Sequence, residues 1–187
     1  MGIEAVCGSG CFGAAGGLPA LELRTWKAVK IAPDSEPMLS APDLTATVPR
    51  SPFDELAGYA WLPRLIDKAR AHHAGTRGEY SAYPCPGDRG FLGFFKLDAK
   101  ALGEKIKSGA DDGVIANYVC ANAKGDQAAF RDSLRNPSKN PILMFALYVM
   151  RRNLRKRLGA TRPDIDWSQV NSISKLLAVE EGHPLPS

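Results

Sequence analysis

From residue 51 onward, residues that start and stop helices recur at short intervals. Asp98 and Asn140 are typical N-caps, because their side chains accept hydrogen bonds from the unpaired amides of a first helical turn. Gly109 and Gly159 are typical terminators, since glycine readily adopts the left-handed conformation that ends many helices. The pattern favours a set of brief helices. The ranges predicted to be helical are 54–59, 63–74, 99–107, 112–123, 126–135, 141–158 and a last helix from Asp164 or Asp166 to about 181.

The first two of these helices are predicted from residues 51–75. Ser51 is a candidate N-cap, with Pro52 and Asp54 at positions that suit proline and an acidic residue. Pro63 starts the next helix, because proline lacks an amide hydrogen and is tolerated only in a first turn. Apolar residues from 62 to 73 then recur at helical spacing, and Gly75 ends the helix.

Residues 76–90 are predicted to form a loop. Pro84 and Pro86 flank Cys85, and proline disfavours the helical conformation of the residue before it. Residues 91–95 are apolar and are expected to dock onto the core. No run after residue 50 indicates a strand of useful length. The predicted fold class is therefore all-α, a small multi-helix domain.

Residues 1–50 differ from the rest. Glycines concentrate between 8 and 17 and prolines follow, a mixture that forms neither a long helix nor a confident strand. We expect a loosely ordered Gly/Pro-rich N-terminal segment over 1–50 and a single helical domain over 51–187. The run GSGCFG at 8–13 matches a dinucleotide-binding loop, but Pro19 breaks the helix that such a site requires. Met38 is a hypothetical natural start.

Composition and charge favour a soluble, cytoplasmic protein. Hydrophobic residues make up 44% and charged residues 24%, and the formal net charge is +4. The longest apolar run, 142–150, is shorter than the ~20 residues that cross a bilayer, so no membrane partner is expected. The four cysteines show neither metal-site spacing nor a disulfide framework, which favours reduced thiols.

No metal and no cofactor are expected. The histidines are His72, His73 and His183, and adjacent histidines on a helix point about 100° apart, so two of them do not easily share a metal. No further ligands are indicated by spacing. A pairing of Cys85 with a histidine for nucleophilic catalysis stays open.

Five cations between residues 151 and 157 form a basic cluster near a helix end. Such a cluster can grip phosphates, but it also complements the helix dipole. No aromatic residue is interleaved with it, which disfavours single-stranded nucleic acid as a partner. A solvated helix face is therefore the favoured interpretation. The cluster consists of Arg151, Arg152, Arg155, Lys156 and Arg157.

The segment 61–95 carries the densest polar chemistry. On its helix, Arg64, Asp67 and Lys68 are three and four residues apart and share one side. The following loop adds tyrosines and acids, so helix and loop together can form a polar pocket. The alternative is an ion-pair network that only fixes the loop. The candidate binding residues are Arg64, Lys68 and Arg89, and the candidate catalytic residues are Asp67, Asp88 and Tyr80.

The same segment resembles a known family. The runs WLPRLIDKARAHHAGTRGEY at 61–80 and CPGDRGFLGFF at 85–95 closely resemble a bacterial family catalogued only as a domain of unknown function, number five-zero-six-nine. The resemblance covers roughly residues 51–123. It implies a small helical protein and carries no function to transfer.

We expect a binding or interaction module whose polar pocket, near 61–95, takes a small anionic ligand. One alternative is a small-molecule hydrolase acting on esters or lactones, with Asp67 or Asp88 as general base, Tyr80 as donor and Arg64 as oxyanion stabiliser. The other is nucleic-acid binding through the 151–157 cluster, the less favoured partner. The sequence does not determine whether the protein is an enzyme, nor its oligomeric state.

Overall fold

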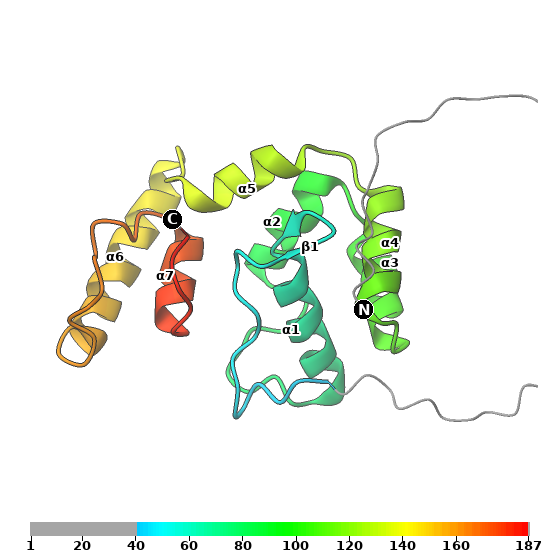
Figure 1. Cartoon of the computed structure of the whole chain (residues 1–187), viewed down its shortest axis with the longest axis horizontal. Helices are drawn as coiled ribbons and strands as arrows, with labels where there is room; N and C mark the ends of the chain where they lie inside the picture. Colours follow the sequence, from blue (N-terminus) through cyan, green and yellow to red (C-terminus); the bar gives the residue numbers. More distant parts are fainter. Residues whose placement is uncertain (1–40, 187) are drawn as a thin grey trace, which may run out of the picture.

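A computed structural model describes residues 41–186, and this part consists of seven α-helices and one two-stranded hairpin (Figure 1). The all-α prediction is confirmed. The glycine-rich motif at 8–13, the start at Met38 and most of the N-terminal segment lie outside the described residues. The elements are β1 (Glu55–Leu56), β2 (Tyr59–Ala60), α1 (Leu62–Ala74), α2 (Pro86–Phe95), α3 (Ala99–Lys107), α4 (Asp112–Asn122), α5 (Gln127–Arg135), α6 (Pro141–Leu158) and α7 (Ile173–Glu180).

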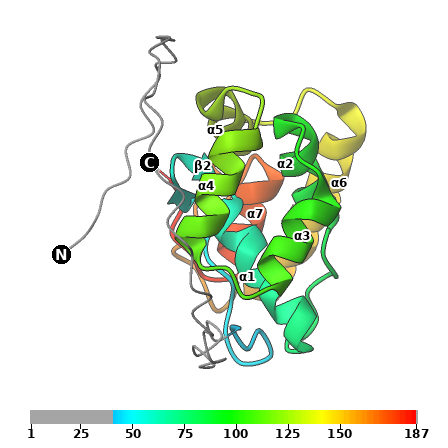
Figure 2. The same ribbon diagram turned by 90° about the vertical axis from the view of Figure 1, so that its right-hand side faces the viewer.

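Helix α1 is the centre of the described chain. Every residue from 62 to 71 is buried, including its charged side chains. Helix α3 packs along α1, and β1 also contacts it; Figure 2 shows α3 and α4 in front of α1. Phe91 and Phe95 of α2 join Leu62, Leu65 and Ile66 in the main hydrophobic core. A helix enclosed in this way needs an internal partner for each of its charges.

The prediction of a helical turn over 54–59 is wrong. Glu55 pairs with Ala60 and Leu56 with Tyr59 in an antiparallel hairpin. The two residues between the strands, Ala57 and Gly58, have φ of 51° and 81°. A two-residue connection with positive φ at both positions matches the right-handed twist of the paired strands. A right-handed helical turn has negative φ and would not join the strands in this way.

The prediction of a loop over 76–90 is wrong at its end, because α2 begins at Pro86. Cys85 is the N-cap: its amide donates to Asp88 Oδ2 at 2.9 Å, and its Sγ accepts from the Asp88 amide at 3.4 Å. Pro86 suits the first helical position, where the missing amide hydrogen would have no partner. The expected docking of 91–95 is confirmed, since Phe91, Leu92 and Phe95 are buried.

Four later helices confirm the predicted boundaries to within about two residues. They begin after Asp98, Asp111, Asp126 and Asn140, and each cap side chain accepts from a backbone amide of its first turn. Helices α3, α4, α5 and α6 therefore follow from local capping chemistry.

Helix α7 begins later than predicted. Ser172 is its N-cap, with Ser172 Oγ accepting from the Lys175 amide at 3.2 Å. Asp166 does not start a helix, because its carboxylate instead accepts from the amide and hydroxyl of Ser168 in a local turn. The predicted end near 181 is confirmed.

Helix α5 connects two hydrophobic clusters. Phe130 belongs to the main core, and α5 also contacts α7 on its other side. The second cluster, which α6 and α7 share, contains Leu147, Leu154, Val170, Leu176 and Val179. Figure 1 shows α5 running across the top of the molecule, with α7 lying between α6 and α1.

Residues 44–50, inside the segment expected to be loosely ordered, lie against α1 and the residues that follow it. Leu44 is buried and its amide donates to Thr76 O at 2.8 Å. Arg50 donates to both carboxylate oxygens of Asp67. Among residues 41–186, no helix combines the length and apolar character that crossing a bilayer requires.

Candidate functional site

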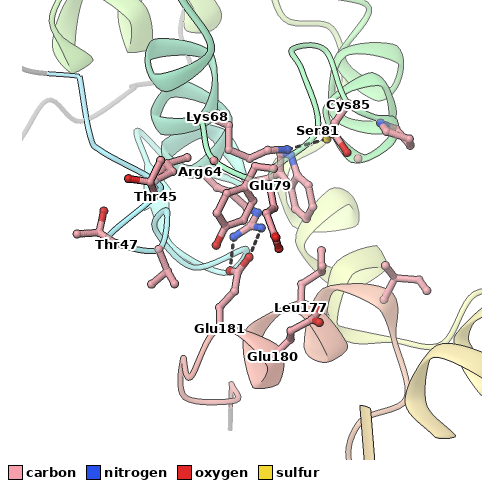
Figure 3. Close-up of a pocket in the computed structure, with 18 of the residues that line it drawn as sticks. Thr45, Thr47, Arg64, Lys68, Glu79, Ser81, Cys85, Leu177, Glu180 and Glu181 are labelled. Atoms are coloured by element: carbon pink, nitrogen blue, oxygen red, sulfur yellow. Dashed lines mark hydrogen bonds and ion pairs between the residues drawn. The ribbon is translucent and has the colours of Figure 1, made fainter. Parts of the chain in front are cut away.

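A cavity of about 1270 Å³ opens between α1 and α7, and we call it the α1/α7 cavity. Three segments form most of its walls: 44–48, 78–81 in the loop after α1, and 85–87 at the start of α2. Figure 3 shows Arg64 and Lys68 reaching it from α1 and Glu181 from the end of α7. The remaining lining residues are Trp61, Ile173, Leu177 and Glu180.

Arg64 and Glu181 form a buried bidentate ion pair at this cavity. The Nη1–Oε2 and Nη2–Oε1 distances are 2.5 and 2.6 Å, and the two side chains are 3% and 7% exposed. The guanidinium also lies 5.7 Å from the centre of the Trp61 ring and 6.0 Å from that of Tyr80. Arg64 Nε is buried without a hydrogen-bond partner among the described residues.

Lys68 lies one helical turn further along α1, beside the N-terminus of α2. Its ammonium donates to Cys85 Sγ at 2.8 Å and lies 3.6 Å from Asp88 Oδ2. Asp88 is fully buried, and its other oxygen accepts from Trp61 Nε1 at 3.1 Å. The ammonium and the N-terminus of α2 both place positive charge next to the sulfur, and the Asp88 carboxylate lies beside them.

Tyr80 lines the cavity, and its side chain is partly buried. Burial, together with the nearby charge of Glu181, raises the pKa of Tyr80 to about 12, although Arg64 opposes this shift. The phenol keeps its proton at neutral pH, as an ordinary tyrosine also does. The donor role of Tyr80 stays a prediction.

The structure brings together only part of the candidate set from the sequence. Arg64, Lys68 and Tyr80 line the cavity, and Asp88 lies behind Cys85 without lining it. Asp67 faces away and is held by Arg50. Arg89 is exposed and does not line the cavity. Arg70 also lies outside the cavity and pairs with Asp112 at 2.8 Å.

The sequence analysis missed Glu181 and underrated Cys85. Glu181 lies 117 residues after Arg64, and no spacing rule connects positions so far apart. Cys85 pairs with Lys68 rather than with a histidine, and no histidine lines the cavity. Within residues 41–186, no group of three histidine, cysteine or acidic side chains is arranged to hold a metal ion.

Fold and cavity define a compact all-helical unit with charged side chains buried around a central helix. The chain matches the family described as Domain of unknown function (DUF5069) over residues 46–141, just over half of its length, and it belongs to that family. The resemblance seen in the sequence over 51–123 is thereby confirmed. The matched range includes Arg64, Lys68 and Cys85, whereas α7 and Glu181 follow it. A search of curated proteins found no match.

Proposed function

We propose that this protein is a binding module for a small organic molecule with an anionic oxygen group, and that the α1/α7 cavity is its site. The cavity, at about 1270 Å³, is large enough, since small-molecule sites commonly measure about 300–1,000 Å³. Leu44, Trp61 and Leu177 supply apolar wall, and a few charged groups converge between them. This combination is typical of ligand sites.

Lys68 is the observation that carries the proposal. Its side chain is 5% exposed, and the ammonium has three N–H donors. Within the described residues it has two neighbours, the thiol of Cys85 and the carboxylate of Asp88, the latter at the longer distance of 3.6 Å. Asp88 balances the charge of this ammonium, but among the described residues the one hydrogen bond that the ammonium donates goes to Cys85 Sγ. Buried donors without acceptors are costly, and a ligand oxygen in the cavity would accept from one of them.

The rest of the lining restricts the ligand further. Arg64 is already neutralised by Glu181, and Glu79 adds negative charge to the wall. Glu180 pairs with Arg157 and adds a further carboxylate that can accept hydrogen bonds. A simple inorganic anion would therefore be repelled from much of the cavity. A hydroxy or amino carboxylate fits better, because its hydroxyl or ammonium groups can donate to these carboxylates while its own carboxylate reaches Lys68.

A ligand panel on the full-length chain tests this proposal. Thermal unfolding is followed with hydroxy carboxylates, amino carboxylates and inorganic phosphate, and any compound that raises Tm is titrated calorimetrically. We expect at least one hydroxy or amino carboxylate to raise Tm in a concentration-dependent way. Lys68→Met should abolish that rise. Lys100→Met, which removes an exposed ammonium on α3, should retain it.

Each variant is compared with its own ligand-free Tm, because Lys68→Met also leaves Asp88 without its cation. If Lys68→Met does not fold, Ala46→Trp offers a second route, since it places a large side chain at the cavity wall without removing a charge. A panel without any stabilising carboxylate, or equal stabilisation of wild type and both cavity variants, would contradict the proposal.

A further inference from the structure

A second concave site lies at the C-terminal end of α6, away from the α1/α7 cavity. It measures about 680 Å³, and we call it the basic groove. The chain that follows α6 turns back beside this helix (Figure 1), and its residues Trp167 and Ser168 line the groove. We propose that the basic groove binds single-stranded nucleic acid, with bases against its aromatic rings and phosphates on its cations. It is lined by Tyr148, Arg151, Arg152, Arg155, Lys156, Trp167 and Ser168.

The charge of α6 supports a polyanionic occupant. The helix contains no aspartate or glutamate, so its cations cannot pair with neighbours on their own helix. Arg152, Arg155 and Lys156 are exposed and have no carboxylate partner among the described residues. Arg151 donates weakly to the backbone carbonyls of Trp167 and Val170, at 3.5 and 3.3 Å. At least three cations are therefore available for phosphates.

The tertiary structure supplies the aromatic residues that the sequence around the cluster lacks. Trp167 comes from the connection between α6 and α7, and it packs in part against the second hydrophobic cluster. Tyr148 precedes the cations by one turn of α6 and is 55% exposed. Flat rings beside unpaired cations form the stacking platform by which proteins hold single strands without sequence preference.

The shape of this end of α6 favours nucleic acid over a lipid surface. The most exposed apolar side chains of α6 lie near its start, where Ile142 and Phe145 are 76% and 69% exposed, whereas Met150, next to the cations, is 41% exposed. The basic groove itself is concave, and both aromatic rings and cations line it. The nearby carboxylates Asp164 and Asp166 bond to Arg162 and Ser168 and do not line it.

All residues that line the groove come later in the sequence than residue 141, where the match to the family model ends. It is thus built from residues outside the matched helical unit. Binding here would be independent of the α1/α7 cavity, so either proposal can fail without the other.

Fluorescence anisotropy with a labelled twelve-residue oligo(dT) tests the inference on the full-length chain. We expect binding at 50 mM NaCl that weakens with salt, with a log–log slope of about −2 for three phosphate contacts on a single strand. The double variant Arg152→Gln/Arg155→Gln should weaken binding at least tenfold and flatten the slope by roughly 1.4. The matched control Lys100→Gln/Lys107→Gln removes two exposed charges from α3 and should bind as wild type.

The aromatic contribution is tested separately with Tyr148→Ser, which changes an exposed side chain and should leave Tm unchanged. We expect a loss of roughly tenfold in affinity with the salt slope preserved, because a stacked base contributes without a charge. Heparin and phosphatidylglycerol vesicles serve as competitors that lack bases. No binding of the oligonucleotide, full affinity in Tyr148→Ser, or tight vesicle binding without oligonucleotide binding would overturn the proposal.

Discussion

The ion pair between Arg64 and Glu181 should be a main stabilising link between α1 and the C-terminal helix. Glu181→Gln keeps the shape of the side chain and removes its charge. Arg64, 3% exposed, would then retain a buried charge without a counter-ion. The pair joins positions 117 residues apart in the sequence.

The structure gives a magnitude for this change. Removing one partner of a buried ion pair costs about 3–5 kcal/mol, since the remaining charge stays desolvated. We take the lower end, about 3 kcal/mol, because both side chains line a cavity large enough to admit water. For a chain of this length that corresponds to a fall in Tm of roughly 6–12 °C.

Urea unfolding at pH 7, followed by far-UV circular dichroism, measures the effect. Glu180→Gln is the matched control. Glu180 pairs with Arg157, and these side chains are 40% and 65% exposed, respectively. Exposed ion pairs contribute only about 0–1 kcal/mol, so this substitution should have little effect. The double variant Arg64→Met/Glu181→Gln should be less destabilised than the sum of the single variants. Equal effects of Glu181→Gln and Glu180→Gln would refute the reasoning.

Two further predictions concern α2 and Tyr80. Gly87→Ala should destabilise the protein by about 1–3 kcal/mol, because the added Cβ would lie 2.4 Å from a ring carbon of the buried Trp61. Gly90→Ala on the same helix is the control: its Cβ would meet nothing within 4 Å, and it should stabilise the protein by up to about 1 kcal/mol. Urea unfolding midpoints compare the two variants, and similar midpoints would contradict the predicted clash with Trp61. Because the pKa of Tyr80 is raised from 10.0 to about 12, the folded state holds its proton more tightly than the unfolded state. Stability should therefore fall as pH rises from about 10 to about 12, and it should fall less in Tyr80→Phe; an identical fall in both proteins would exclude this origin.

Helix boundaries were predictable wherever a single local interaction sets them. The carboxylates of Asp98 and Asp126 bond to amides two residues away, and Asn140 does the same. Such contacts need no tertiary partner, so the residue type and its position suffice. The same locality explains why Arg64 and Lys68, four residues apart on one helix, both line the cavity. Asp67, expected on the same side, does not line the cavity and contacts Arg50 instead.

The hairpin and α2 were missed because their local signals pointed elsewhere. Alanine seldom adopts a positive φ, so Ala57 gave no sign of the two-residue turn that it forms with Gly58. A thiol is a weak acceptor and does not suggest an N-cap, and Cys85 serves as one because Asp88 completes the capping box. Tertiary contacts support both unfavourable local choices: the Ala57 carbonyl accepts from Gln127 of α5, and Cys85 Sγ accepts from Lys68 of α1.

The sequence by itself determined that this protein is a set of short helices with a charged central segment, because capping and helical spacing act over a few residues. Only the tertiary structure decided what those charges do. It brought Glu181 to Arg64 and Trp167 to the cations of α6, across 117 residues in the first case. Contacts of that kind depend on how whole helices pack, and no periodicity along the chain encodes them.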